Sequence, residues 1–291
     1  MTAQPPEFPE VSVVMPARDA AATIAFQLAA LADQSFDRAW ELIVVDDGSR
    51  DETAEVAARW ADRFPSFKIL ATAEPRGQSH ALNIGTRAAR GRLIAYCDAD
   101  DVVSTRWLAG LTSALSEASM VTGPFDLAML NPPRLYSWRP SPMWQRLPRW
   151  RGYLAPVINA NMGVRAETFE NLGGFDEELT TCEDYDFSFR VQLAGGTIGF
   201  ARDAVLHYRL RRGWPYFRRL YEYGLGHVEL YHRFRNQGLR RGIVRGTARL
   251  VAAGLGAPVV VIRKYRYGWI TLAGVELGRL RGSLRKRTLF L

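Results

Sequence analysis

Short apolar runs alternate with segments of helical periodicity along the first half of the chain. Runs rich in β-branched residues predict strands at 11–15, 41–45, 67–71 and 92–97. The segments between them carry apolar residues at helical spacing and predict helices at 23–31, 51–64 and 79–89. Strands that alternate with helices are typical of a parallel sheet covered on both faces. We therefore expect an α/β domain with a mostly parallel sheet.

The regular alternation weakens after a helix expected at 104–115 and a strand expected at 120–125. Further on, 159–165 is strand-like, and helices are expected at 183–194 and 214–234. Residues 131–156 are rich in proline and predict a long surface loop. Its Trp138, Trp144 and Trp150 favour a platform for a ligand or a membrane.

Charge divides the chain unequally. Residues 1–204 contain 19 basic and 27 acidic residues, whereas 205–291 contain 19 basic and 3 acidic ones, giving net charges of −8 and +16. A long basic segment predicts an anionic partner such as a membrane surface, a polyanion or nucleic acid. Compositional drift toward arginine is the alternative, since 35 of the 38 basic residues are Arg. Drift alone would not explain why acidic residues vanish from the same stretch.

The basic region contains one apolar stretch. Residues 250–262 are all apolar or glycine apart from Pro258. This stretch is shorter than the ~20 residues that cross a bilayer. Its basic flanks favour a helix or helical hairpin lying at a membrane interface, and packing back onto the domain is the alternative.

The remaining features of the sequence predict that the catalytic part stays in the cytoplasm. Residues 1–9 lack a basic segment followed by an apolar run, so no secretion signal is expected. The two cysteines, Cys97 and Cys182, cannot build a disulfide framework and lack zinc-ligand spacing.

The sharpest local motif is Cys-Asp-Ala-Asp-Asp at 97–101, directly after an apolar strand. Clustered carboxylates repel one another unless a cation lies between them. Oxygen ligands favour a hard ion such as Mg²⁺ or Mn²⁺. The alternative is a solvated acidic turn that caps the next helix. A second acidic turn, 46–51, follows another strand, and open α/β sheets bind ligands where such strands end.

With these motifs, the chain resembles the inverting glycosyltransferases of family 2, which have the GT-A fold. Four motifs stand in the family's order: Val-Ser-Val-Val-Met-Pro-Ala-Arg at 11–18, Asp-Asp-Gly-Ser-Arg-Asp at 46–51, Asp-Ala-Asp-Asp at 98–101 and Cys-Glu-Asp-Tyr-Asp-Phe at 182–187. The resemblance covers about residues 10–210. It implies a GT-A domain over 1–210, followed by a basic helical C-terminal region, 211–291, that we expect to associate with a membrane.

The resemblance also implies roles for individual residues. Asp98 and Asp100 would be the metal-binding DxD pair, and Asp98 would also meet the nucleotide. Asp184 would be the catalytic base, although it could equally be an acid that suits a helix N-terminus. The other expected nucleotide-binding residues are Pro16, Ala17, Arg18 and either Asp46 or Asp47.

General chemistry supports the same assignment. Displacement at an anomeric carbon needs one carboxylate to take the proton of the acceptor hydroxyl and a cation to absorb charge on the leaving diphosphate. A single base opposite the leaving group inverts the configuration. Glu183, next to the base, would then orient the acceptor.

Two features depart from the family pattern. The Arg-Asn pair common after the third strand is reduced to Asn83, so Arg76 is the candidate for the missing charge. The Gln-x-x-Arg-Trp signature of processive synthases is absent, which favours transfer of a single sugar. The segment most similar to that signature is Leu-Arg-Arg-Gly-Trp at 210–214, and its Trp214 would stack on an acceptor or donor sugar.

Three further residues follow the short run 203–206. His207 is the candidate for a third metal ligand, with a structural role as the alternative. Arg211 and Arg212 would clamp the diphosphate through guanidinium–phosphate pairs, with a solvated basic turn as the alternative.

Other functions fit the sequence less well. A dinucleotide-binding oxidoreductase would need G-x-G-x-x-G after the first strand, and a sugar-phosphate nucleotidyltransferase usually opens with a Gly-rich basic loop. No nucleic-acid-binding motif interrupts the basic region. A degenerate GT-A protein acting as a membrane scaffold is the non-enzymatic alternative. We therefore expect an inverting glycosyltransferase that uses Mn²⁺ or Mg²⁺ and a nucleoside-diphosphate sugar. Its acceptor would be lipid-linked or otherwise displayed at the inner face of the membrane.

Overall fold

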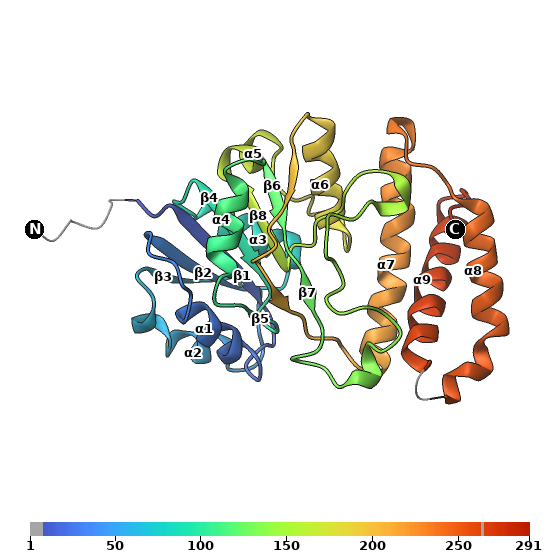
Figure 1. The fold of residues 1–291 in the computed structure, drawn as a ribbon, viewed down its shortest axis with the longest axis horizontal. Coiled ribbons are helices and arrows are strands. Elements are labelled where there is room, and N and C mark those ends of the chain that lie inside the picture. Colours follow the sequence, from blue (N-terminus) through green and yellow to red (C-terminus); the bar gives the residue numbers. More distant parts are fainter. Residues whose placement is uncertain (1–7, 263–264) are drawn as a thin grey trace, which may run out of the picture.

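The computed structural model describes residues 8–262 and 265–291 (Figure 1). A seven-stranded sheet forms its centre, in the spatial order β3-β2-β1-β4-β8-β6-β9. Strands β1 to β4 are parallel, whereas β8 runs antiparallel to both β4 and β6. The strands span Val11–Ala17 (β1), Trp40–Asp46 (β2), Phe67–Ala71 (β3), Leu93–Cys97 (β4), Met120–Thr122 (β6), Asn161–Arg165 (β8) and Ile198–Phe200 (β9). The expected mostly parallel α/β sheet is confirmed.

Successive residues of the central strands face two different apolar cores. In β1, Val13 and Met15 pack into one core and Val14 packs into the other. Helices α1 (Ile24–Ala32) and α4 (Trp107–Leu115) close the first core, and α3 (Gln78–Arg87), α5 (Ala166–Asn171) and α6 (Glu183–Leu193) close the second. A short helix, α2 (Thr53–Ala58), lies on the same side as α1. Burial on both faces explains why these strands are continuous apolar runs.

A small second sheet lies beside the acidic loop that follows β4. It consists of β5 (Val102–Val103), β10 (Leu206–His207) and β7 (Phe125–Asp126). Because β10 pairs with both neighbours, it brings the chain at 206–211 next to the acidic loop after β4.

The C-terminal region is helical, as expected, and packs as one layer (Figure 1). It contains α7 (Gly213–Phe234), α8 (Ile243–Leu255) and α9 (Arg266–Arg285). Glycines let α7 and α9 approach closely, since a Cβ atom on Gly224 would lie 2.3 Å from the Val275 carbonyl oxygen. Over the described residues, we find no helix with the length and hydropathy that a membrane crossing needs.

The segment 131–156 contains two single-turn 3₁₀ helices, Pro133–Leu135 and Trp150–Gly152, and its tryptophans do not form the expected platform. Trp144 packs edge-to-face on Phe125 at 5.2 Å between ring centroids. Trp150 lies 5.9 Å from Tyr185, and the Trp138 ring packs where α9 begins. These rings are half-buried because they attach the segment to the body of the protein.

Candidate active site

A cavity of about 930 Å³ opens where β1, β2 and β4 end, and α6 and α7 form its opposite wall. It brings together residues that are far apart in the sequence. The expected site residues that line it are Pro16, Ala17, Arg18, Asp47, Asp98, Asp100, Glu183, Asp184 and Arg211. The convergence follows from the sheet, because parallel strands end at one edge.

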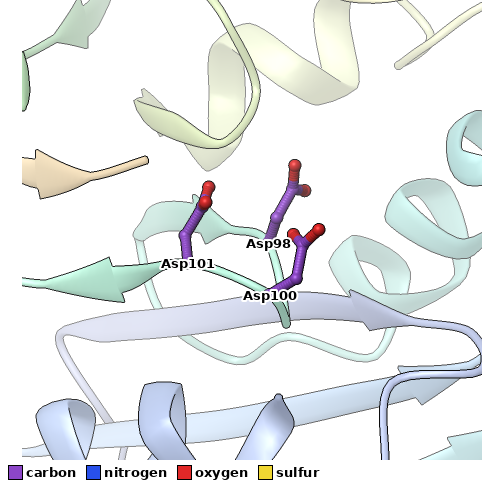
Figure 2. Close-up of side chains that lie close together, drawn as sticks. All are labelled: Asp98, Asp100 and Asp101. Carbon is purple, nitrogen blue, oxygen red and sulfur yellow. The ribbon is translucent and has the colours of Figure 1, made fainter. Parts of the chain in front are cut away.

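Three aspartates cluster in the loop after β4 (Figure 2). One carboxylate oxygen from each of Asp98, Asp100 and Asp101 lies within 4.8 Å of the other two. Gln78 Nε2 donates a 2.9 Å hydrogen bond to Asp98 Oδ1, and the Arg209 backbone N–H donates a 2.7 Å bond to Asp101 Oδ1. Asp101 Oδ2 is buried and has no hydrogen-bond partner among the described residues.

The surroundings of the cluster disfavour its negative charge. Burial, followed by repulsion from Asp100, raises the pKa of Asp98 to about 7. Burial and the two neighbouring carboxylates hold the pKa of Asp101 well above its usual range. A cation would reverse this cost, and three converging oxygen donors with an orphaned buried oxygen fit a hard divalent ion such as Mg²⁺ or Mn²⁺.

The expected base lies on the opposite wall, in the first turn of α6. Asp184 Oδ1 accepts a 2.8 Å hydrogen bond from the Tyr185 N–H, and its Oδ2 accepts a 3.4 Å bond from the Asn159 N–H. Burial, followed by repulsion from Glu183, raises the pKa of Asp184 to about 8. The preceding residue, Cys182, has a φ of 64°, so the chain turns sharply before the helix begins. Asp184 is thus both a first-turn acid and a cavity residue.

An arginine that the sequence analysis did not single out lies in the same wall. The Arg219 guanidinium carbon is 4.8 Å from the ring centroid of Tyr223, one helical turn further along α7. Burial lowers the pKa of Arg219, but Tyr223 and Glu183 outweigh it and the pKa is raised. Burial raises the pKa of four cavity carboxyls, and the Arg219 charge partly offsets that rise: Asp98, Asp100, Glu183 and Asp184. In the sequence, Arg219 and Tyr223 are four residues apart, which places them on one face of a helix, and this spacing could have identified the arginine.

Of the two aspartates that end β2, Asp47 lines the cavity. Its carboxylate accepts 2.9 Å hydrogen bonds from the backbone N–H groups of Arg76 and Gly77, so it fixes the loop before α3. Asp46 lies outside the cavity lining and accepts a 3.0 Å bond from the Ser49 N–H within its own turn.

Besides Asp46, four other expected residues lie outside the cavity lining. His207 lies outside the lining, where its Nδ1 pairs with Asp126 Oδ2 at 2.9 Å, and its role as a third metal ligand stays a prediction; Asp101 supplies the third carboxylate of the cluster. Arg76 is exposed and lies 3.8 Å from Glu177. At the start of α7, exposure to solvent likewise keeps two side chains outside the lining: Arg212 and Trp214.

Known proteins resemble this chain in both sequence and fold. Glycosyltransferase AglE of Haloferax volcanii is 26% identical over 230 residues, which are 77% of this chain and 74% of AglE. The Escherichia coli protein WfgD, a UDP-Glc:alpha-D-GlcNAc-diphosphoundecaprenol beta-1,3-glucosyltransferase, is 33% identical over 99 residues, or 34% of this chain and 36% of its own length. The mannosyltransferase PcManGT of Pyrobaculum calidifontis, solved in complex with GDP-Man and Mn²⁺, has a TM-score of 0.69 at 20% identity and covers 97% of this chain and 89% of its own.

Family models match the same region as the motifs. The model of glycosyl transferase family 2 matches residues 12–172, and that of glycosyl transferase family group 2 matches residues 93–277. The first match alone spans more than half of the chain and contains the strands whose ends build the cavity. The chain is therefore a glycosyltransferase enzyme with a GT-A-like fold, and it belongs to glycosyl transferase family 2.

Proposed function

We propose that this enzyme transfers a single sugar from a nucleoside-diphosphate sugar to a hydroxyl acceptor, with inversion at the anomeric carbon and with Mn²⁺ or Mg²⁺ as cofactor. The observation that carries the proposal is one cavity with an acidic cluster on one wall and Asp184 on the other. This arrangement provides separate places for a leaving diphosphate and for an acceptor.

The donor would lie along the ends of β1, β2 and β4. Pro16, Ala17 and Arg18 line this part of the cavity, and Asp47 offers a carboxylate to the base or ribose. The binding of GDP-Man and Mn²⁺ by PcManGT supports a nucleoside-diphosphate sugar as the class of donor.

Asp98 and Asp100 would hold the cation, with Asp101 as the third carboxylate of the cluster. When bound, the cation neutralises charge that develops on the leaving diphosphate. Arg211 lines the cavity and lowers the pKa of Asp98 and Asp100, so its charge acts on the same region and suits a diphosphate contact.

Asp184 would act as the base. As the acceptor oxygen bonds to the anomeric carbon and the bond to the diphosphate breaks, the hydroxyl proton moves to the Asp184 carboxylate. Attack opposite the leaving group gives inversion. Glu183 accepts a 2.9 Å hydrogen bond from the Asn159 side chain and would position the acceptor side of the cavity.

The acceptor would be lipid-linked, and the enzyme would work peripherally at the cytoplasmic face of the membrane. The net charge of +16 over 205–291 supports an anionic membrane surface as the partner of this region. The lipid-linked acceptor named for WfgD supports the same class.

A thermal-shift screen of sugar nucleotides tests the donor and the cofactor together. We expect one donor class to raise the melting temperature in the presence of Mn²⁺, because a ligand that binds only the folded state stabilises it by mass action. Donor hydrolysis should require the cation and fail in Asp184→Asn. Cation-independent turnover, or full activity of Asp184→Asn, would contradict the proposal.

A further inference from the structure

The outermost helix of the protein, α8, exposes large apolar residues and buries small ones, which is the reverse of the pattern in a helix that packs on a soluble core. Among the positions of α8 whose burial the structure describes, the buried ones are small: Gly246 and Ala253. Two of its large apolar residues face solvent, with Val251 53% and Leu255 79% exposed. The chain beyond the helix continues in the same way, with Val261 73% and Ile262 48% exposed. We call these four exposed residues the α8 patch.

The inner side of α8 is already occupied, so the patch cannot be buried by a small adjustment. Trp269 on α9 donates a 2.8 Å hydrogen bond from its indole N–H to the Ala253 carbonyl oxygen. A Cβ atom on Gly256 would lie 3.1 Å from the same indole ring. Small residues therefore let α8 lie close against α9 and leave the larger ones outside. Val251 and Leu255 lie one turn apart on the same face of α8, and an exposed apolar surface of this kind marks an interaction site.

The charge of this part of the chain favours an anionic partner for the patch. Residues 230–275 contain nine basic residues and no acidic residue. A second copy of this chain would bring two equally positive surfaces together, which Coulomb repulsion opposes. An anionic bilayer offers both acyl chains for the apolar side chains and negative headgroups for the arginines.

We propose that the α8 patch is a membrane-docking surface that lies in the headgroup region of an anionic bilayer, with α8 along the surface. The orientation has a consequence for the cavity. The end of α8 and the beginnings of α7 and α9 lie at the same end of the molecule (Figure 1). There Tyr216 of α7, which lines the cavity, bonds through its hydroxyl to Thr271 of α9 at 2.6 Å. Docking thus holds the α7 wall of the cavity near lipid, where a lipid-linked acceptor would enter; this last step rests on the proposed function.

Vesicle co-sedimentation of the full chain tests the docking without donor or acceptor. We expect binding to vesicles that contain phosphatidylglycerol, weak binding to phosphatidylcholine alone, and weaker binding at high salt. Leu255→Glu should lower the partition onto anionic vesicles about tenfold or more, because it places a charge at the centre of the patch. Leu193→Glu is the matched control, since this leucine is 42% exposed at the end of α6 and should bind as the unaltered chain does.

Melting temperatures of both variants establish that they remain folded. Unchanged vesicle binding by Leu255→Glu, an equal loss in Leu193→Glu, or a dimer that Leu255→Glu dissociates without any vesicle binding would each overturn the proposal. Donor hydrolysis separates it from the proposed function. Leu255→Glu should retain hydrolysis in solution and lose transfer to an acceptor held in vesicles, whereas Asp184→Asn should bind vesicles normally and lose both reactions.

Discussion

The side chain of Asn159 donates a 2.9 Å hydrogen bond to Oε1 of Glu183. Glu183 is only 4% exposed, so this bond fixes a carboxyl group that lines the cavity but is almost fully buried. The backbone N–H of Asn159 makes only a long 3.4 Å contact with Asp184, which is more open to the cavity. The two adjacent acids therefore differ. A side-chain hydrogen bond positions Glu183, whereas Oδ2 of Asp184 has only this long contact and can accept a proton.

This difference predicts unequal effects of two isosteric substitutions. Asp184→Asn should lower the rate of transfer by about 10²–10⁴, which is the usual contribution of a general base. Glu183→Gln keeps an oxygen that can accept the Asn159 hydrogen bond and should lower the rate much less. Initial rates at saturating donor, with donor binding checked by thermal shift, make the comparison. A larger loss in Glu183→Gln than in Asp184→Asn would reverse the two assignments.

The pH dependence should report the same base. Burial and Glu183 raise the pKa of Asp184 to about 8, so the carboxyl is protonated and inactive in the free enzyme at lower pH. We expect kcat/KM to rise with pH through about 8, because this ratio follows ionisation of the free enzyme. The residual rate of Asp184→Asn should lack this rise.

Stability should change with pH in the opposite direction. An acid whose pKa is higher in the folded state than the ordinary 3.8 holds its proton more tightly when folded. Its contribution to the free energy of unfolding is complete below pH 4 or so and is lost as pH rises through about 8. Asp184→Asn should therefore lose less stability than the unaltered chain between these limits, and equal losses in melting experiments would contradict the assigned burial.

The acidic cluster should control the response to metal. Asp98→Asn and Asp100→Asn should each remove the rise in melting temperature that Mn²⁺ gives in the presence of donor. A ligand at 100 times its Kd stabilises the folded state by about 2.7 kcal/mol, which thermal shift detects readily. His207→Asn tests the expected third ligand, whose ring pairs with Asp126 outside the cavity lining. A metal response lost in His207→Asn and kept in Asp100→Asn would place the ion on the histidine and not on the aspartate pair.

Asp101 should limit the stability of the metal-free protein. Its Oδ2 is buried without a partner among the described residues, and two other carboxylates lie beside it. Asp101→Asn keeps an oxygen for the Arg209 N–H and removes one charge from the cluster. Without metal, the variant should melt about 2–4 °C higher, as roughly 1 kcal/mol of stabilisation gives in a chain of this size class. A lower melting temperature would show that the carboxylate is better satisfied than its contacts indicate.

The central sheet and most of the cavity could be predicted because they depend on local pattern and strand order. Apolar runs predicted β1, β2 and β4, and the rule that ligands bind at strand ends brought Asp47 and Asp98 together. The rest depends on long-range pairing. The pairing of β10 with β7 sets His207 beside Asp126, and no local sequence pattern indicates that partner.

The tryptophans of 131–156 show the same limit. Trp150 packs against Phe290, which is 140 residues further along the chain, and no local pattern indicates such a partner. The proline- and tryptophan-rich sequence favoured a binding platform. In the structure the half-buried rings attach this long segment to the rest of the protein.

Arg219 was missed because its importance comes from α7 lying across the ends of the strands. Removing its charge in Arg219→Gln should raise the pKa of Asp184, since Arg219 is one of the groups that lower it. We expect the rise of kcat/KM with pH to move to higher pH and the rate near neutrality to fall by about threefold to tenfold. Arg219→Lys keeps the charge and should show a smaller displacement. Arg235→Gln is the matched control, because that arginine, just beyond the end of α7, is exposed and lies outside the cavity lining. A midpoint that is the same in Arg219→Gln and Arg235→Gln would show that the Arg219 charge does not reach the base.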